Sequence, residues 1–228
     1  MSQLSPFDYN KAVAELPVLR DFIDFINRQI GVYTDSVSSY DGNKIRIERQ
    51  VARVLHRTGK QIEDGQEVMM HTSFEDHNSP KVIHISVTST DQYMSANSEK
   101  GFNHQQTCWA IIVFMFAFWN EEVRPKIARI REVEVQKVVV DAFGDLRIVR
   151  NAIIHNKGIM SAKEYGKLKV MSQLFQADKT IRLSHDQMHS LFVYIKQAIA
   201  SIIMEYVGHL PGAPEISEIA GVAIQAPR

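Results

Sequence analysis

The sequence predicts a mainly helical protein, a bundle of helices that carries one β-hairpin. Apolar residues recur at spacings of three and four along most of the chain, which is the period of an amphipathic helix. Only residues 66–90 depart from this pattern, with alternating polar and β-branched residues that are typical of strands. The chain has 228 residues, of which 45% are hydrophobic and 23% charged, so it can bury a sizeable core.

The composition of the chain indicates where in the cell the protein is found and how it could bind nucleic acid. The 26 basic and 26 acidic residues cancel, so binding to nucleic acid needs a local patch rather than a global field. A single cysteine, Cys108, cannot form an internal disulfide, and the N-terminus lacks the basic and apolar regions of a signal peptide. Residues 108–119 are apolar but shorter than the roughly 20 residues that span a bilayer. We therefore predict a cytoplasmic protein with no membrane segment, in which 108–119 is a helix buried on all sides.

The N-terminal hundred residues predict a helical pair followed by the hairpin. The polar stretch 31–43 separates the two helices, and Asp41-Gly42-Asn43 is its clearest break. The turn of the hairpin is expected at 75–80. The expected elements are helices at 8–30 and 44–62 and strands at 66–74 and 81–90. We assign residues 1–100 to this region, an elaboration on the helical bundle that follows.

The second of these helices is strongly basic on one side. Arg49, Arg53 and Arg57 repeat every fourth residue and therefore point in one direction. Such a strip can follow a phosphate backbone, which makes it a candidate for nucleic-acid binding. The alternative is a solvated helix face with no ligand.

The middle of the chain predicts two helices in succession. The first is expected from residue 103 to residue 122. The next begins near Pro125 and continues to residue 140, before a break at Phe143-Gly144.

Two capping boxes predict the helix starts of the last third. They lie at 161–164 and 184–187, and the first of these helices is expected to end near residue 174. The long last helix carries its apolar face on Met188, Leu191, Phe192, Ile195, Ala198, Ile199 and Ile202. Glycine, proline and small residues then predict a disordered tail over 208–228.

One segment, residues 145–158, concentrates polar side chains in what otherwise has the pattern of a buried helix. At about 100° per residue, Leu146, Val149 and Ile153 fall together and predict a side that faces the core. Asn156-Lys157-Gly158 predicts the end of this helix, because asparagine and glycine tolerate the left-handed conformation that caps a helix.

The other side of this helix is polar but not uniformly so. Arg147, Asn151 and His155 form a stripe spaced four apart, and Arg150 stands beside it. Ile154 falls inside this polar sector. Because an isoleucine there suits a subunit interface better than open water, we predict that this face packs against a second subunit.

The sequence Arg150-Asn151-x-x-x-His155 resembles the motif of the HEPN superfamily, in which an arginine is followed by a polar residue and, after four to six positions, by a histidine. The bare spacing also occurs at Arg49–His56 and Arg182–His189. Only the segment at 150–155 adds the polar residue after arginine, an apolar filling and a glycine soon after.

The surroundings of the motif extend the likeness. Residues 118–126 upstream and 181–186 downstream look like the flanks of the motif in bacterial HEPN proteins. The resemblance covers about residues 102–207.

The resemblance implies a HEPN-type helical bundle over 101–207 that forms a homodimer, with both motifs lining a cleft at the interface. It also implies an activity, a metal-independent endoribonuclease of toxin or phage-defence type that needs no cofactor and leaves a cyclic phosphate on its RNA substrate. The catalytic residues would be Arg150, Asn151 and His155. The RNA-binding residues are expected to be Arg49, Arg53 and Arg57, on the basis of their spacing and not of the resemblance, which does not extend to them. Proteins of this kind are often held silent by an antitoxin or another regulatory protein.

The residue types fit this chemistry. His155 can take a proton from a ribose 2′-hydroxyl or give one to a leaving oxygen. Arg150 is always charged and can fork onto phosphate oxygens, while Asn151 can orient either partner. On one regular helix Arg150 and His155 stand about 140° apart, so we expect their convergence to need a helix end between them or a second copy. The alternative for His155 is a helix-terminal residue favoured by the helix dipole.

Three further residues are expected to support the motif. Glu121 and Glu122 close the preceding helix, where a polar residue often faces the motif in HEPN bundles. One of them is expected to pair with Arg147 or Arg150. The alternative is an exposed helix end.

Two other functions stay open from the sequence alone. One is a non-catalytic HEPN-like module that binds RNA, a nucleotide or a protein partner through the same cleft. The other is a helical interaction protein in which the motif is only an interface. The intact motif favours the enzyme. No metal site is predicted, because His185 and His189 share a helix face without a third ligand nearby.

Overall fold

A computed structural model describes residues 9–59, 61, 67–76 and 78–207. The chain divides into two compact units. Unit 1 joins Met1–Tyr33 to Cys108–Arg228, and unit 2 is Thr34–Thr107. The predicted boundary at residue 100 differs from this division, because the N-terminal helix packs with the C-terminal helices. The tail predicted over 208–228 lies outside the described residues.

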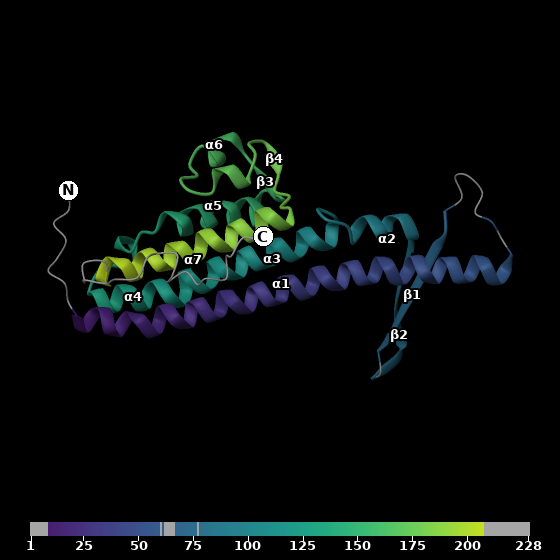
Figure 1. The fold of residues 1–228 in the computed structure, drawn as a ribbon, viewed down its shortest axis with the longest axis horizontal. Coiled ribbons are helices and arrows are strands. Elements are labelled where there is room, and N and C mark those ends of the chain that lie inside the picture. Colours follow the sequence, from purple (N-terminus) through teal and green to yellow (C-terminus); the bar gives the residue numbers. More distant parts are fainter. Residues whose placement is uncertain (1–8, 60, 62–66, 77, 208–228) are drawn as a thin grey trace, which may run out of the picture. The chain divides into compact units, whose positions relative to one another are not determined.

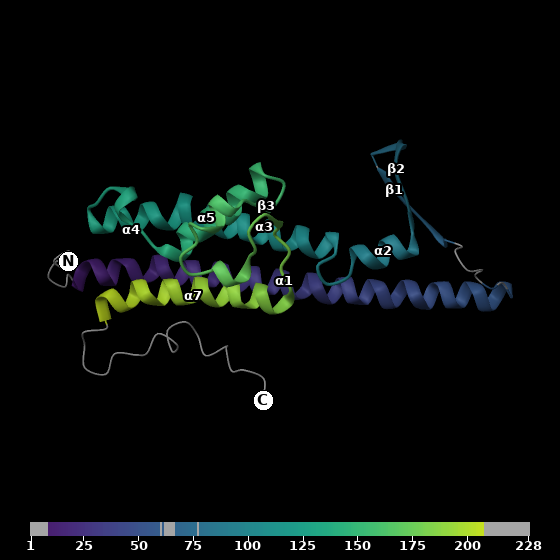
Figure 2. The ribbon, with the colours of Figure 1, turned by 90° about the horizontal axis from the view of Figure 1, so that it is seen from above.

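Unit 1 is a bundle of helices. Figure 1 and Figure 2 show its long helices side by side, with a small cap of short elements at one end of α5. The helices are α1 (Tyr9–Thr58, as far as Tyr33), α3 (Phe102–Phe118, from Cys108), a π-helical turn (Trp119–Val123), α4 (Arg124–Arg131), α5 (Asp141–His155) and α7 (His185–Val207). The short elements of the cap are α6 (Ala162–Tyr165), a 3₁₀ turn at Ser172–Leu174, and the paired strands β3 (Ile159–Met160) and β4 (Lys179–Thr180). A further 3₁₀ turn, Val135–Lys137, lies between α4 and α5.

An aromatic cluster fixes the positions of α1, α3 and α5 within unit 1. Phe22 of α1 is fully buried, and its ring centroid lies 5.8 Å from that of Phe118 and 5.6 Å from that of Phe143. Trp119 stacks on Phe143 at 3.9 Å. Aromatic pairs at such distances add to the free energy gained by burial alone. The helix that carries the motif therefore begins from a rigid base.

A charge cluster with a buried carboxylate joins α1, α4 and α7. Arg131 of α4 donates two hydrogen bonds to the fully buried Glu15 of α1, at 2.7 and 3.0 Å. The same guanidinium pairs with Glu205 of α7 at 3.0 Å. A buried carboxylate needs such a bidentate partner, because an unpaired one would lose its hydration without compensation.

Unit 2 contains the rest of α1, the hairpin and α2. The strands β1 (Met69–Asp76) and β2 (Ser79–Ser89) pair antiparallel, from Met69 opposite Ser89, with a bulge after Glu75. This confirms the predicted hairpin. α2 (Thr90–Ala96) follows and lies alongside the second half of α1 in both views.

The predicted N-terminal helical pair is wrong, because α1 is one helix of 50 residues. Gly31 and Gly42 lie inside it, although each glycine costs a helix about 1 kcal/mol. Tertiary contacts within each unit offset that cost. In unit 1, Tyr33 is buried and its hydroxyl lies 2.8 Å from Nδ1 of His185; in unit 2, Tyr40 hydrogen-bonds Thr107 at 2.6 Å.

Other predicted helix boundaries also change. α4 ends at Arg131 instead of continuing to residue 140, because Glu132 adopts the left-handed conformation with φ of 57°. Phe143 and Gly144 do not separate two helices, as was predicted, but lie inside α5. The helix expected over 161–174 is reduced to α6 and a 3₁₀ turn.

The apolar segment 108–119 is helical as predicted but is not buried on all sides. Cys108 is fully buried, and burial raises the pKa of its thiol to about 12, so it is not a nucleophile at neutral pH. Phe114, in contrast, is 62% exposed. Among the described helices, none combines the length and the apolar character that crossing a membrane requires.

Candidate functional site

The motif helix α5 is anchored by its apolar side. Leu146 and Val149 are fully buried, as predicted, whereas Ile153 is only partly buried. The buried carboxylate of Asp145 accepts backbone hydrogen bonds from residues 169–171 at 2.8 to 3.1 Å. These bonds tie the loop after α6 to the start of the motif segment. The sequence pattern did not reveal this role, because an aspartate inside a helix usually faces solvent.

The end of α5 falls where the sequence predicts it. Lys157 and Gly158 both have positive φ, 54° and 78°, and the N–H of Gly158 donates to the carbonyl of Ala152 at 2.9 Å. A β-carbon on Gly158 would overlap the indole ring of Trp109. That indole donates from Nε1 to the carbonyl of Ile181 at 3.1 Å, which holds it in place. The contact between helix end and indole therefore sets the position of the last turn of α5.

The three motif side chains come together at this helix end. Nη1 of Arg150 lies 3.0 Å from Oδ1 of Asn151 and 3.4 Å from Nε2 of His155. The expectation that a single helix cannot bring Arg150 and His155 together is wrong. Their α-carbons do diverge around the helix, but the long arginine side chain spans the difference. His155 is exposed, and Arg150 and Asn151 are partly exposed, so a ligand can reach all three.

The contact between Arg150 and His155 joins a guanidinium to a ring nitrogen. A guanidinium has donors only, so in this contact Nε2 of His155 is the acceptor. Histidine is also a residue type that can act as a general acid or base, which is the role that cleavage of RNA requires.

A polar hollow of about 460 Å³ lies beside the motif on α5. Arg147 and Asn151 line it together with Glu164, Lys167 and Lys169. The hydroxyl and the backbone N–H of Ser161 donate hydrogen bonds to the Glu164 carboxylate and lower its pKa below the usual 4.5. Asp141 and Asp145 also line the hollow, so three basic side chains face three carboxylates there, and Lys169 pairs with Asp141 at 2.7 Å. Asn151 belongs both to this hollow and to the hydrogen-bonded motif.

The structure gives Glu121 and Glu122 other partners than the predicted arginines. Both are exposed and lie in the π-helical turn Trp119–Val123. Glu122 pairs with Lys126 at 3.1 Å, and Glu121 accepts a hydrogen bond from Asn120 at 2.7 Å. The exposed-helix-end alternative describes them better.

Arg49, Arg53 and Arg57, the predicted basic strip, are all exposed, but only two of them line the same hollow. Arg53 and Arg57 line a hollow of about 480 Å³ on α1 in unit 2 together with Arg46, while Arg49 is not among its lining residues. Arg46 was not predicted. A spacing of seven residues and then four keeps 46, 53 and 57 on one face, a pattern that the strict four-residue repeat missed.

Within the part of the chain that the structure describes, no group of three histidine, cysteine, aspartate or glutamate side chains could hold a metal ion. His185, which shares a face of its helix with His189, instead forms a hydrogen bond with Tyr33.

Comparisons with known proteins do not extend this description. No protein-family model, no curated protein and no solved structure matches the chain. The motif and its geometry are therefore the basis for a function.

Proposed function

We propose that the protein is a metal-independent endoribonuclease of the HEPN type, with Arg150, Asn151 and His155 as its catalytic residues. One observation carries the proposal. Arg150 lies within hydrogen-bonding distance of both Asn151 and His155, the two other motif residues, at an exposed helix end. A surface histidine without a role would not need this arrangement.

In the proposed reaction His155 is the general base. Its imidazole removes the proton of a ribose 2′-hydroxyl, and the oxygen attacks the adjacent phosphorus. A new P–O bond forms, the bond to the 5′-oxygen breaks, and the departing oxygen takes a proton from water or from an imidazolium. The products are a 2′,3′-cyclic phosphate and a 5′-hydroxyl. Arg150 stabilises the extra negative charge on phosphorus, and Asn151 orients the guanidinium.

A homodimer forms part of the proposal. Phe114 is 62% exposed and Ile154 is 46% exposed, and both belong to unit 1. Ile154 directly precedes the motif histidine, and an exposed isoleucine within a polar helix face suits a surface that a second subunit covers. Light scattering at micromolar concentration is expected to give about twice the chain mass of 26.0 kDa. A monomer at that concentration would contradict a composite site.

We place the enzyme among cytoplasmic toxins or phage-defence proteins, with an antitoxin or regulatory protein as a possible partner. Expression of wild-type protein in bacteria is then expected to stop growth and degrade RNA, and His155→Ala is expected to do neither.

The deciding experiment measures cleavage and stability on the same purified variants. A fluorescent single-stranded RNA is incubated in excess EDTA with wild type, His155→Ala, Arg150→Ala and Arg150→Lys. We expect both alanine variants to lose on the order of 100-fold or more in rate at an unchanged melting temperature. Arg150→Lys should recover only part, because a point charge cannot fork onto two oxygens.

His189→Ala is the matched control. His189 is also exposed, on α7, and follows Arg182 at a spacing that fits the loose pattern. The His189→Ala protein should cleave the RNA at the wild-type rate. Full activity of a folded His155→Ala protein would show that the motif is not catalytic, and inactivation by EDTA that a metal restores would show a different chemistry.

A further inference from the structure

Unit 2 contains a cavity of about 440 Å³ that the proposed active site does not use. Ile47, Val51 and Leu55 of α1 form one wall. Met69 and Met70, at the start of β1, and Tyr93 of α2 form the others. Aliphatic and methionine side chains of this kind make an apolar surface that can adapt to a flat or irregular ligand.

An arginine cluster adjoins this cavity. The hollow lined by Arg46, Arg53 and Arg57 shares Arg46, Gln50 and Val54 with the cavity, so the two are continuous. No carboxylate of the described part of the chain lines either one. Among the described residues, none forms an ion pair with these three guanidinium groups. They form a basic rim on an apolar cavity.

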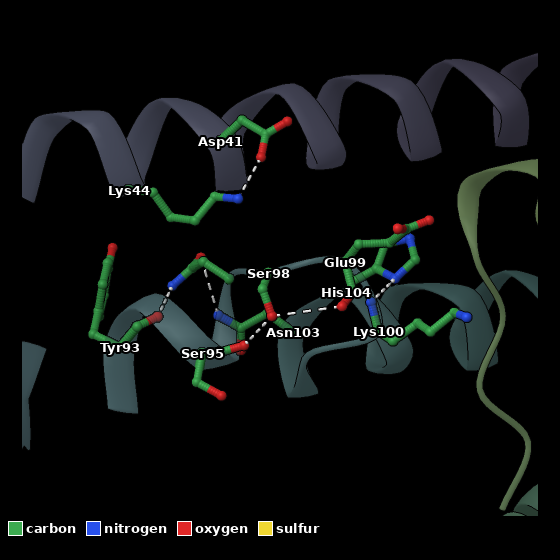
Figure 3. A network of polar contacts seen from close by, with 10 residues as sticks. Asp41, Lys44, Tyr93, Ser95, Ser98, Glu99, Lys100, Asn103 and His104 are labelled. Atoms are coloured by element: carbon green, nitrogen blue, oxygen red, sulfur yellow. Dashed lines mark hydrogen bonds and ion pairs between the residues drawn. The ribbon is translucent and has the colours of Figure 1, made fainter. Parts of the chain in front are cut away.

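The wall that holds Tyr93 is rigidly built. Figure 3 shows the Tyr93 ring pointing from α2 toward α1, and the surrounding polar contacts. The backbone carbonyl of Tyr93 accepts a hydrogen bond from Asn97 at 2.8 Å, and Asn97 in turn accepts one from Asn103 at 3.3 Å. A capping box between Ser89 and Gln92 fixes the other end of α2. These contacts fix the backbone of α2, from which Tyr93 projects.

The pattern of charges on α1 suits a chain of phosphates. Arg46, Arg53 and Arg57 lie on one face, separated by about 10 Å and about 6 Å along the helix axis. All three are arginines, which bind phosphate oxygens with two donors at once. Gln50 and Thr90 add hydrogen-bonding groups to the apolar lining. A flat ring that also carries polar edges would use both kinds of group.

We infer that unit 2 binds single-stranded RNA, with one unstacked base in the cavity against Tyr93 and its neighbouring phosphates on Arg46, Arg53 and Arg57. The inference rests on the proposed function only in the choice of RNA as the polymer. An acidic amphipathic helix would match the charge as well. Such a helix would call for a uniformly apolar groove, whereas this cavity is also lined by Tyr93, Gln50 and Thr90, which suit a flat ring with polar edges.

The test measures binding with full-length protein that carries His155→Ala, so that cleavage does not interfere. The probes are labelled 12-nucleotide oligo(U) and oligo(A), and the same oligomers with abasic sites, followed by fluorescence anisotropy over a range of salt. Replacing Arg46, Arg53 and Arg57 by glutamine should lower affinity at least tenfold and reduce the salt slope by about 2, because each phosphate contact on a single strand contributes about 0.7.

Arg49→Gln is the matched control for charge. Arg49 is exposed on the same helix but does not line the hollow, so affinity should stay within about twofold. Tyr93→Leu should weaken binding by about 5- to 150-fold, the range expected for loss of one stacked base, and Tyr93→Phe should bind like the parent. Circular dichroism checks that each variant is folded.

Three results would overturn the inference. Arg49→Gln could weaken binding as much as Arg46→Gln, which would indicate general attraction to a basic helix. Abasic oligomers could bind as tightly as intact ones, which would remove the base from the cavity. A helical peptide of leucine and glutamate could bind the cavity while RNA does not, which would make it a protein-docking site. Failure of wild type to cleave RNA that His155→Ala protein binds would instead count against the proposed enzyme alone.

Discussion

Gly158→Ala should destabilise the protein more than any other single methyl group added to the motif segment. Gly158 follows the last turn of α5 at φ of 78°. The new β-carbon would lie 2.5 Å from Cη2 of Trp109 and closer still to Cζ2. The indole cannot turn aside without breaking its hydrogen bond to Ile181. Backbone strain and steric overlap therefore act together.

The magnitude follows from these two terms. An L-residue in the left-handed region costs about 1–2 kcal/mol. Overpacking by one methyl group against a fixed neighbour costs about 1–3 kcal/mol. Together they give about 3 kcal/mol, which for a protein of this size lowers the melting temperature by about 6–12 °C.

Gly144→Ala is the matched control in the same helix. Gly144 lies inside α5 and has nothing within 4 Å of an added β-carbon, so alanine there should stabilise by about 0.5–1 kcal/mol. Thermal unfolding by circular dichroism should therefore give shifts of opposite sign. Combining Gly158→Ala with Trp109→Phe, which removes the overlapping ring atoms, should recover part of the loss. If Gly158→Ala melts like wild type, Trp109 does not hold the end of the motif helix.

Two further predictions concern the carboxylates around α5. Asp145→Asn should lower the free energy of unfolding, measured in urea, by about 2–4 kcal/mol, because an amide cannot accept every backbone hydrogen bond from residues 169–171. Asp141 is exposed, so Asp141→Asn should change this free energy little. Equal effects of the two substitutions would contradict the prediction. The lowered pKa of Glu164, caused mainly by Ser161, means that its ionised form stabilises the protein above its usual 4.5 and that this stability is lost as the pH falls through the lower folded value. Glu164→Gln should therefore be less stable than wild type at about pH 6 and converge with it in acid, and a difference independent of pH would refute the assignment.

Patterns of short range predicted the local structure well. The hairpin, both capping boxes and the helix end at 156–158 occur where the sequence places them. In each, neighbouring residues make the deciding hydrogen bonds with one another. Such signals do not depend on what the rest of the chain does.

The predictions failed where contacts with residues distant in the sequence determine the local structure. The stretch 31–43 has the composition of a loop, yet it is helical in α1, with Tyr33 bonded to His185 in unit 1 and Tyr40 to Thr107 in unit 2. The sequence pattern predicts Asp145 as a polar residue on a helix surface. In the structure its carboxylate accepts hydrogen bonds from loop N–H groups that lie 24 to 26 positions later in the chain. Neither partner can be identified from periodicity, since a long-range contact leaves no local pattern.

The motif itself shows the remaining limit of reasoning from helical angles. About 140° separates Arg150 from His155 around α5, and that angle describes where the α-carbons point. Nη1 of Arg150 nevertheless lies 3.4 Å from Nε2 of His155, because a flexible side chain can cross an angle that two short ones cannot. The two groups therefore need no second copy to converge on one phosphate, and a role for the dimer has to lie elsewhere, in covering Phe114 and Ile154 or in supplying the acid for the leaving oxygen. A heterodimer of His155→Ala with Arg150→Ala separates these roles: if each subunit works alone it stays inactive, whereas a shared site would recover a measurable part of wild-type cleavage.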